Sequence, residues 1–174
     1  MSGNDSKVFR EGKLIGKLQK GRINMGDTIP VGIYRLFESC MREALDKQIG
    51  PDACIEAFRE AGRIAGAKFY KEYLYEASST VELLTLMKSL FVELKMGIVR
   101  VESIREDEKI ILTISEDLDC SGLPIIGETV CHYDEGFLEG ILKSYSHKDY
   151  EAIEIDCWAK GDRVCRFDIK PKEE

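Results

Sequence analysis

YEAIEIDCWAKGDRVCRFDI, residues 150–169, contains the hairpin on which the fold depends. Two runs, YEAIEIDCWA and RVCRFDI, alternate apolar and polar side chains with the period of two that is typical of β-strands. Between them stands Lys160-Gly161-Asp162, and glycine beside aspartate favours a turn. The pattern predicts an antiparallel hairpin with this turn at its tip.

Two cysteines stand at equal distances from the turn. With Gly161 at the centre, Cys157 lies opposite Cys165, and directly opposed Cβ atoms in a hairpin are about 5 Å apart. Two thiolates on one tetrahedral zinc ion are separated by about 4 Å. The pair can therefore bind one metal ion without distorting the sheet.

Glu154 precedes Cys157 by an odd number of residues, which places the two side chains on opposite faces of a regular strand. In such a strand Ile153 and Ile155 share the face of Cys157. Glu154 can bind the same ion as Cys157 only if the strand contains a bulge or begins irregularly. A third sulfur is available at Cys131, which we expect in the first turn of a helix, where partial positive charge favours a thiolate.

These residues form a candidate four-coordinate site with no open position, and therefore a structural one: Cys131, Glu154, Cys157 and Cys165. Either Cys120 or His132 could replace Glu154 as a ligand. Plain burial is the other interpretation of the thiols, because free cysteine buries readily as a small hydrophobe. The N-terminus has no apolar signal segment, so we expect a cytoplasmic protein whose cysteines are reduced rather than paired in disulfides.

The hydrophobic period changes near residue 97. Upstream, apolar residues recur at helical spacing in three segments, 31–48, 52–74 and 79–96. Gly62 and Gly66 in the second segment leave room for the close approach of a neighbouring helix. These three segments predict one helical half of the chain.

Downstream of residue 97 the period is two in 97–104 and 109–115, which predicts a first hairpin around the polar turn REDE. A helix from about 128 to 145 then precedes the terminal hairpin. We expect an α+β fold in which N-terminal helices pack on a C-terminal antiparallel sheet with an inserted helix. The chain of 174 residues is interpreted as a single domain with three parts: an extension (1–30), a helical half (31–96) and a sheet half (97–174).

Composition limits the partners. The 25 basic and 32 acidic residues give a net charge of −7, and a nucleic-acid-binding protein needs a concentrated positive surface instead. The apolar runs are far too short to span a bilayer. We therefore expect no nucleic-acid partner and no membrane partner.

The segment VCHYDEGFLEGILKSYSHKDYEAIEIDCWAKGDRVCRFDI, residues 130–169, resembles the 4-vinyl reductase domain family in its Gly-Phe-Leu-x-Gly helix, Glu-x-x-Cys and Cys-x-Phe motifs. That family includes stand-alone archaeal proteins and the ligand-sensing domains of phenol- and xylene-responsive transcription activators. Its fold is similar to that of vesicle-tethering transport-particle subunits. In the sensor members three cysteines and a glutamate hold a zinc ion, so the resemblance implies a structural zinc on Cys131, Glu154, Cys157 and Cys165.

The resemblance also implies a small-molecule-binding or sensor domain that encloses an apolar ligand between helices and sheet. Four residues of the third helical segment are the candidate lining: Met87, Leu90, Phe91 and Leu94. An ordinary filled core is the other interpretation of each. The phenol sensors read their ligand with a histidine and a tryptophan upstream of the zinc ligands, where this chain has neither, so phenol itself is not expected. Any signal would pass to another protein.

Two further functions stay open. A homodimeric scaffold is suggested by the tethering-particle analogy and by the apolar helix around 37–45, although burial within one monomer explains the same residues. A reductase linked to tetrapyrrole metabolism is suggested by the family name. The chain has no glycine-rich dinucleotide fingerprint and neither histidine has a recognisable catalytic partner, so we expect a binding protein rather than an enzyme.

Overall fold

The computed structural model describes residues 18–105 and 108–172. The chain divides into two compact units, 1–41 and 42–174, and each is described by itself. The beginning of the predicted extension, 1–17, and the middle of the predicted REDE turn, 106–107, lie outside the described residues. No helix among the described residues combines the length and the apolar character needed to cross a membrane.

The first unit contains a short helix, α1 (Leu18–Gly21), and the start of α2 (Val31–Ile49). Pro30 directly precedes α2, where a residue without a backbone N–H costs the helix nothing. The predicted helix over 31–48 is thereby confirmed. It buries none of its residues, and six large apolar side chains on it are exposed: Val31, Ile33, Leu36, Phe37, Met41 and Ile49.

Two long helices begin the second unit after the end of α2. The first, α3 (Pro51–Phe69), continues through a π-helical turn (Tyr70–Leu74), and α4 (Thr80–Glu93) follows. Ser79 caps α4, because its hydroxyl accepts the backbone N–H of Glu82 at 3.2 Å. The Glu82 carboxylate accepts the N–H of Ser78 at 2.9 Å in return. Both predicted helices are confirmed.

Apart from a short 3-10 helix within the terminal hairpin (Trp158–Lys160), the remaining elements of the described chain form a four-stranded sheet and one helix. The strands are β1 (Ile98–Arg105), β2 (Lys109–Ser115), β3 (Tyr150–Asp156) and β4 (Cys165–Pro171), and α5 (His132–Ser146) separates the two hairpins. The order in the sheet is β1-β2-β4-β3, and every neighbouring pair is antiparallel. The predicted α+β class is confirmed.

One face of the sheet forms the core. Directly paired residues point to the same face, so the register gathers one continuous buried set: Val99, Ile110, Leu112, Ile114, Ala152, Cys165, Phe167 and Ile169. Helix α4 contacts β1 and α5 contacts β3. On the opposite face Arg166 forms an ion pair with Glu102, as expected for an antiparallel sheet with one solvated side.

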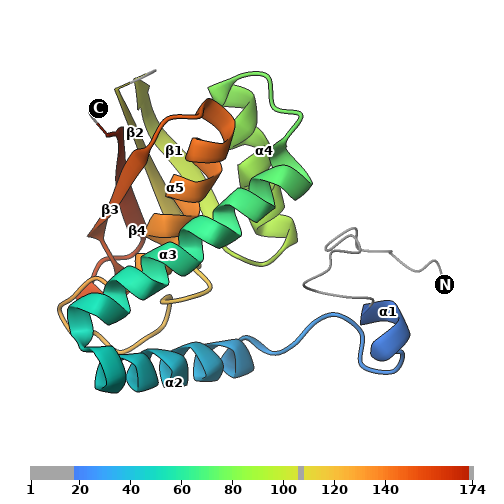
Figure 1. Cartoon of the computed structure of the whole chain (residues 1–174), viewed down its shortest axis with the longest axis vertical. Helices are drawn as coiled ribbons and strands as arrows, with labels where there is room; N and C mark the ends of the chain where they lie inside the picture. The colour runs from blue at the N-terminus through green and yellow to red at the C-terminus, as the bar shows by residue number, and fades with distance from the viewer. Residues whose placement is uncertain (1–17, 106–107, 173–174) are drawn as a thin grey trace. The chain divides into compact units, whose positions relative to one another are not determined.

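Helix α5 is the inner helix and α3 lies outside it, crossing it in Figure 1. Glycines on both helices allow their backbones to touch: a methyl group on Gly62 or Gly66 would overlap a backbone carbonyl of α5, and one on Gly136 or Gly140 would overlap a carbonyl of α3. The close approach predicted from the first two glycines is confirmed. Of the N-terminal helices, α4 packs on the sheet directly, whereas α3 reaches it through α5.

Two buried carboxylates of α5 tie α3 to the edge strand β3. Glu135 accepts Arg59 at 2.7 Å and the backbone N–H of Glu154 at 2.9 Å. One helical turn later, Glu139 accepts Arg63 and the N–H of Ala152, each at 3.0 Å. These contacts satisfy backbone donors that a sheet edge would otherwise leave unpaired.

Candidate metal centre

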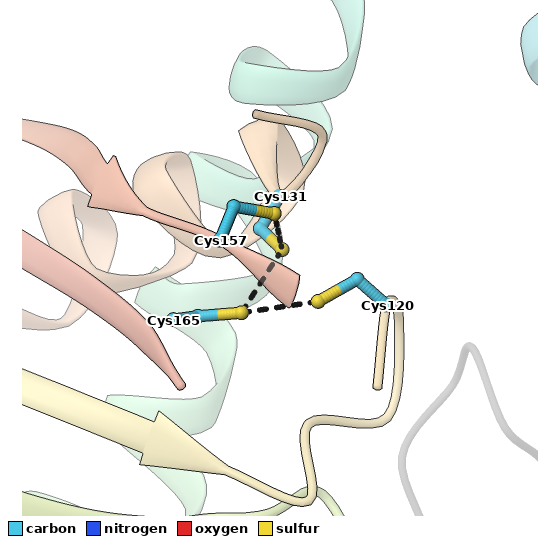
Figure 2. Close-up of side chains that lie close together, drawn as sticks. All are labelled: Cys120, Cys131, Cys157 and Cys165. Atoms are coloured by element: carbon cyan, nitrogen blue, oxygen red, sulfur yellow. Dashed lines mark hydrogen bonds between the residues drawn. The ribbon is translucent and has the colours of Figure 1, made fainter. Parts of the chain in front are cut away.

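Four cysteine sulfur atoms from separate parts of the chain meet in the core of the second unit (Figure 2). Cys120 comes from the loop after β2, Cys131 from the start of α5, and Cys157 and Cys165 from the two sides of the terminal hairpin. The Cys131 sulfur lies 3.9 Å from that of Cys157 and 3.7 Å from that of Cys165. The sulfurs of Cys120 and Cys165 are 3.0 Å apart, and all four lie within 4.8 Å of one another.

These distances suit a single metal ion. Ligands at about 2.3 Å in a tetrahedron place sulfur atoms about 3.8 Å apart. Two of the sulfur distances match that length, and Cys120 and Cys165 are closer together than it requires. Each of the four side chains is at most 1% exposed. The cluster can therefore hold a metal ion, and thiolate sulfur favours a soft or borderline one.

A turn built on Asp117 presents Cys120 to the other sulfurs. One carboxylate oxygen of Asp117 accepts the backbone N–H of Asp119 at 2.9 Å and that of Cys120 at 3.0 Å. Short side-chain to backbone bonds of this kind stabilise turns. Cys120, one of the two rival ligands, thus lies with the three predicted cysteines.

Strand β3 contains the irregularity that Glu154 requires. The pairing of β3 with β4 shifts register between Glu154 and Asp156. Glu154 and Cys157 are both buried, at 4% and 0% exposure, whereas Ile153 and Ile155 are exposed. The predicted bulge is confirmed. The expectation that Ile153 and Ile155 share the face of Cys157 is wrong, because the extra residue reverses the alternation.

Cys131 lies one residue before α5 rather than in its first turn, so the expected start of the helix near residue 128 is wrong. The Glu154 carboxylate accepts the Cys131 backbone N–H at 3.0 Å. This bond satisfies a backbone donor that the start of a helix otherwise leaves unpaired. The other oxygen of Glu154 is buried and has no hydrogen-bond partner among the described residues. Glu154 thus adjoins the sulfur cluster and caps the helix that carries one of the sulfurs.

His132, the second rival ligand, is engaged elsewhere. Its Nδ1 lies 3.2 Å from the carboxylate of Glu135, which also accepts Arg59. Within the described part of the chain, His132 belongs to neither group of side chains spaced to hold a metal ion. The side chain of Trp158 is also hydrogen-bonded: its indole N–H donates to the carbonyl of Leu123 at 3.0 Å.

Without a metal the cluster holds its protons unevenly. Hydrogen bonds, first from Cys120, hold the pKa of Cys157 far below its ordinary value. The pKa values of Cys131 and Cys165 are raised, first by their hydrogen bonds with Cys120. Hydrogen bonds with Cys131 and Cys165 lower the pKa of Cys120, but the hydrogen bond with Cys157, burial and the charge of Asp117 outweigh them and raise that pKa. Burial, followed by the charge of Cys157, raises the pKa of Glu154 to about 8. Hydrogen bonds within the cluster therefore favour ionisation of Cys157 over that of the other three cysteines.

A second group of buried side chains adjoins the first. Ligand atoms of Asp117, Cys131 and Asp134 also lie within 4.8 Å of one another. Burial, and then the charge of Asp117, raises the pKa of Asp134 well above its ordinary value. Sequence reasoning missed both aspartates. The only local signal is that Asp117 precedes Cys120 and Asp134 follows Cys131, each by three residues.

Three of the predicted ligand-pocket residues lie on one side of α4, and the fourth, Leu94, directly follows its last residue. Met87 and Phe91 are buried, at 1% and 2% exposure, and Leu90 and Leu94 are half-buried. The Phe91 ring lies 6.0 Å from that of Phe137 and 6.4 Å from that of Phe69, so aromatic side chains occupy this part of the core.

A separate surface hollow of about 260 Å³ opens at another place in the second unit. Its lining includes Thr80, Ile104, Tyr145 and Tyr150. None of the four predicted pocket residues lines it.

The chain combines an antiparallel sheet covered by helices with a buried thiol cluster between the terminal hairpin and α5. Residues 110–171 match the model of the 4-vinyl reductase domain, which confirms the resemblance predicted from the motifs in this segment. An uncharacterized protein of Methanocaldococcus jannaschii, MJ0150, is 26% identical over 156 residues, which cover 86% of this chain and 80% of that protein.

Solved structures share the fold. The phenol-responsive sensory domain of the transcription activator PoxR, solved with phenol, matches with a TM-score of 0.62 and 16% identity over 82% of this chain and 75% of that one. Subunit 3 of the trafficking protein particle complex from Naegleria fowleri, covalently bound to palmitic acid, matches with a TM-score of 0.59 and 14% identity. That match covers 82% of this chain and 97% of the subunit.

Proposed function

We propose that this chain is a small-molecule-binding domain of the sensor type whose fold is held together by a structural zinc ion. The observation that carries the zinc part is the meeting of four buried cysteine sulfurs from a loop, a helix start and a hairpin. Zinc accepts four thiolates in a closed tetrahedral site and contributes directly to folding free energy. The ion would join α5 to the terminal hairpin and to the loop before it.

The sulfur distances favour Cys120 as the fourth ligand, with Cys131, Cys157 and Cys165 as the other three. In this arrangement Glu154 keeps its hydrogen bond to the Cys131 N–H and acts as a neighbour that orients the ligand. The set in which Glu154 replaces Cys120 is the rival. Substituting Cys120 and Glu154 in turn, and measuring the zinc affinity of each variant, distinguishes the two ligand sets.

The small-molecule part rests on the likeness of fold to a phenol-responsive sensory domain. The proposed binding region is the side of α4 that carries Met87 and Phe91, next to the rings of Phe69 and Phe137. We propose an apolar ligand rather than a phenol, because His132 and Trp158 are bonded to Glu135 and to a backbone carbonyl. Such a ligand would enter by displacing side chains of this region such as Met87, because methionine is flexible and adapts readily.

Native mass spectrometry of protein purified without chelator tests both parts. A bound zinc ion together with a retained lipophilic compound is the expected result. Phe91→Trp should then weaken ligand retention, because a larger ring fills the region, whereas Val92→Trp should not, because Val92 is exposed. Ligand retained equally by both variants would place it elsewhere. A protein that never carries a ligand would contradict the sensor part.

A homodimer is the second candidate, and α2 favours it. Several large apolar side chains are exposed on this helix, among them Ile33, Leu36 and Phe37. An apolar stripe of this kind marks an interaction surface more often than a free surface. A pair of chains joined through α2 would suit either a scaffold or a sensor that passes its signal to a protein partner.

A further inference from the structure

The buried acidic group beside the sulfur cluster shares one residue with it. Asp117, Cys131 and Asp134 offer ligand atoms within 4.8 Å of one another, and Cys131 also belongs to the four-sulfur group. All three side chains are buried. Two sets of metal-ligating atoms therefore meet at one sulfur.

Asp134 supplies an independent sign that something binds here. Its side chain is 8% exposed, and its Oδ2 atom has no hydrogen-bond partner among the described residues. Burying a carboxyl oxygen without a hydrogen-bond partner is costly, and a metal ion at this position would supply the missing partner. Asp134 lies in the first turn of α5, and its carboxylate reaches the same small volume as the Cys131 sulfur and the Asp117 carboxylate.

The combined charge of the four-cysteine group and the acidic group also favours a second metal ion. One divalent ion on four thiolates leaves a formal charge of about −2. The carboxyl groups of Asp117 and Asp134 reach to within 4.8 Å of the Cys131 sulfur, and their ionisation on metal binding would add to that negative charge. Glu154, with one unpartnered oxygen, is a further buried acid in contact with Cys131. A second cation would balance this concentration of charge.

We propose that Asp117, Asp134 and the Cys131 sulfur hold a second divalent metal ion, so that the cysteine cluster and the two aspartates form one binuclear centre bridged by Cys131. The inference rests on the proposed metal site of the four cysteines. Its ligands are two carboxylate oxygens and one thiolate, a mixed set that zinc accepts and that cobalt(II) can report.

The two positions differ in chemistry. The first has four protein ligands and is closed. The second has three protein ligands, so one coordination position remains for water or an atom of a small ligand. Catalytic zinc sites have this arrangement. In two-metal sites the ions are about 3.5 to 4 Å apart. A metal ion at the second position would therefore change the electrostatic environment of the thiolates at the first.

Metal counting on the intact chain tests the proposal. Metal-free protein is saturated with zinc or with cobalt(II), passed through a desalting column, and analysed for metal per chain by mass spectrometry. We expect two ions per chain for the unaltered protein and one for Asp134→Asn, with the sulfur-to-cobalt charge-transfer absorption retained. Asp149→Asn is the matched control, because Asp149 is an exposed aspartate paired with Lys143, and it should keep two ions.

Each outcome decides between the two claims. One ion per chain in the unaltered protein overturns the second position and leaves the four-cysteine site standing, whereas no ion overturns both. Two ions in Asp134→Asn also overturn the second position. The count on the unaltered chain does not depend on how any variant folds, and Asp117→Asn provides a second variant that should lose one ion.

Discussion

The carboxylate of Glu154 accepts a hydrogen bond of 3.0 Å from the backbone N–H of Cys131, although 23 residues separate them. This bond joins strand β3 to the start of α5 at the edge of the sulfur cluster. The Glu154 backbone N–H in turn donates to Glu135, which accepts Arg59 of α3. A continuous set of polar contacts therefore connects the outer helix, the inner helix, the edge strand and the candidate metal centre.

The first prediction separates the two possible zinc ligand sets. With Cys120 as the fourth ligand, Cys120→Ser should lower zinc affinity by more than about 100-fold, because a thiolate is lost from the ion. Glu154→Gln should lower it by about tenfold, the effect of losing a residue that orients a ligand. Competition with a chelator of known affinity measures both. Cys165→Ser should release the metal and lower the melting temperature under either set.

Two cysteines outside the cluster serve as controls for these substitutions. Cys40 is exposed and Cys54 is buried. Cys40→Ser and Cys54→Ser therefore show the effect of replacing a thiol with a hydroxyl at an exposed and at a buried position outside the cluster. Neither should alter zinc affinity. A larger loss for Glu154→Gln than for Cys120→Ser would favour Glu154 as the ligand.

The second prediction concerns protons. In the metal-free cluster hydrogen bonds lower the pKa of Cys157 and favour its thiolate, while the raised pKa values of Cys120, Cys131 and Cys165 favour their protonated forms. Binding to four thiolates should therefore release about three protons per zinc ion. Calorimetry in buffers of different ionisation enthalpy measures this number. Zinc affinity should fall as pH falls, and binding without proton release would contradict a thiolate site.

The third prediction is a pH dependence of stability in the metal-free protein. The pKa of Glu154 is raised from 4.5 to about 8 in the fold, so the folded state binds this proton more tightly than the unfolded state does. The stabilisation is complete below pH 4.5 and is lost as pH rises through about 8. The slope attributable to this group approaches about 1.4 kcal/mol per pH unit.

Glu154→Gln isolates that slope, because glutamine does not titrate. Urea unfolding of the metal-free protein and the variant across this pH range gives the difference in free energy of unfolding. The variant should gain relative stability as pH rises. A difference that is constant with pH would show that Glu154 is ionised in the fold.

The fourth prediction concerns the contact between α3 and α5. Gly66→Ala should lower the free energy of unfolding by about 3 kcal/mol, because the added methyl would overlap the carbonyl of Phe137 and force the helices apart. Gly32→Ala is the control. Gly32 lies within α2 with no neighbouring atom within 4 Å of an added methyl, so this change should be neutral or stabilise by up to about 1 kcal/mol. Equal effects of the two changes would mean that the helices do not touch.

The fifth prediction tests self-association through α2. Phe37 is 66% exposed, and Phe37→Glu should convert a dimer into a folded monomer because it places a charge within an apolar interface. Val92→Glu introduces the same charge at an exposed position of α4 and should leave the dimer intact. Sedimentation velocity reports the mass, and circular dichroism reports whether the variants fold. A monomeric unaltered protein would remove the dimer proposal.

Local periodicity accounts for most of what could be predicted about the fold. Helical spacing identified α2, α3 and α4, and alternation identified both hairpins, because each pattern depends on neighbours only a few residues apart. Gly62 and Gly66 were sufficient to predict a close helix contact. Their partners on α5, Gly136 and Gly140, were not foreseen, because nothing local identifies which helix will be the neighbour.

The candidate site likewise has one part that local sequence patterns predict and another that depends on long-range contacts. The sequence by itself determined that Cys157 and Cys165 oppose each other in one hairpin and that Glu154 needs a bulge to join them, because strand geometry fixes which side chains share a face. Cys131 was predicted from its place near a helix start and from the family resemblance. Only the tertiary structure decided that Cys120 enters the cluster and that Asp117 and Asp134 lie beside Cys131. Those positions depend on the path of the loop after β2 and on where α5 begins. Both are set by contacts between residues far apart in the chain, which no local pattern records.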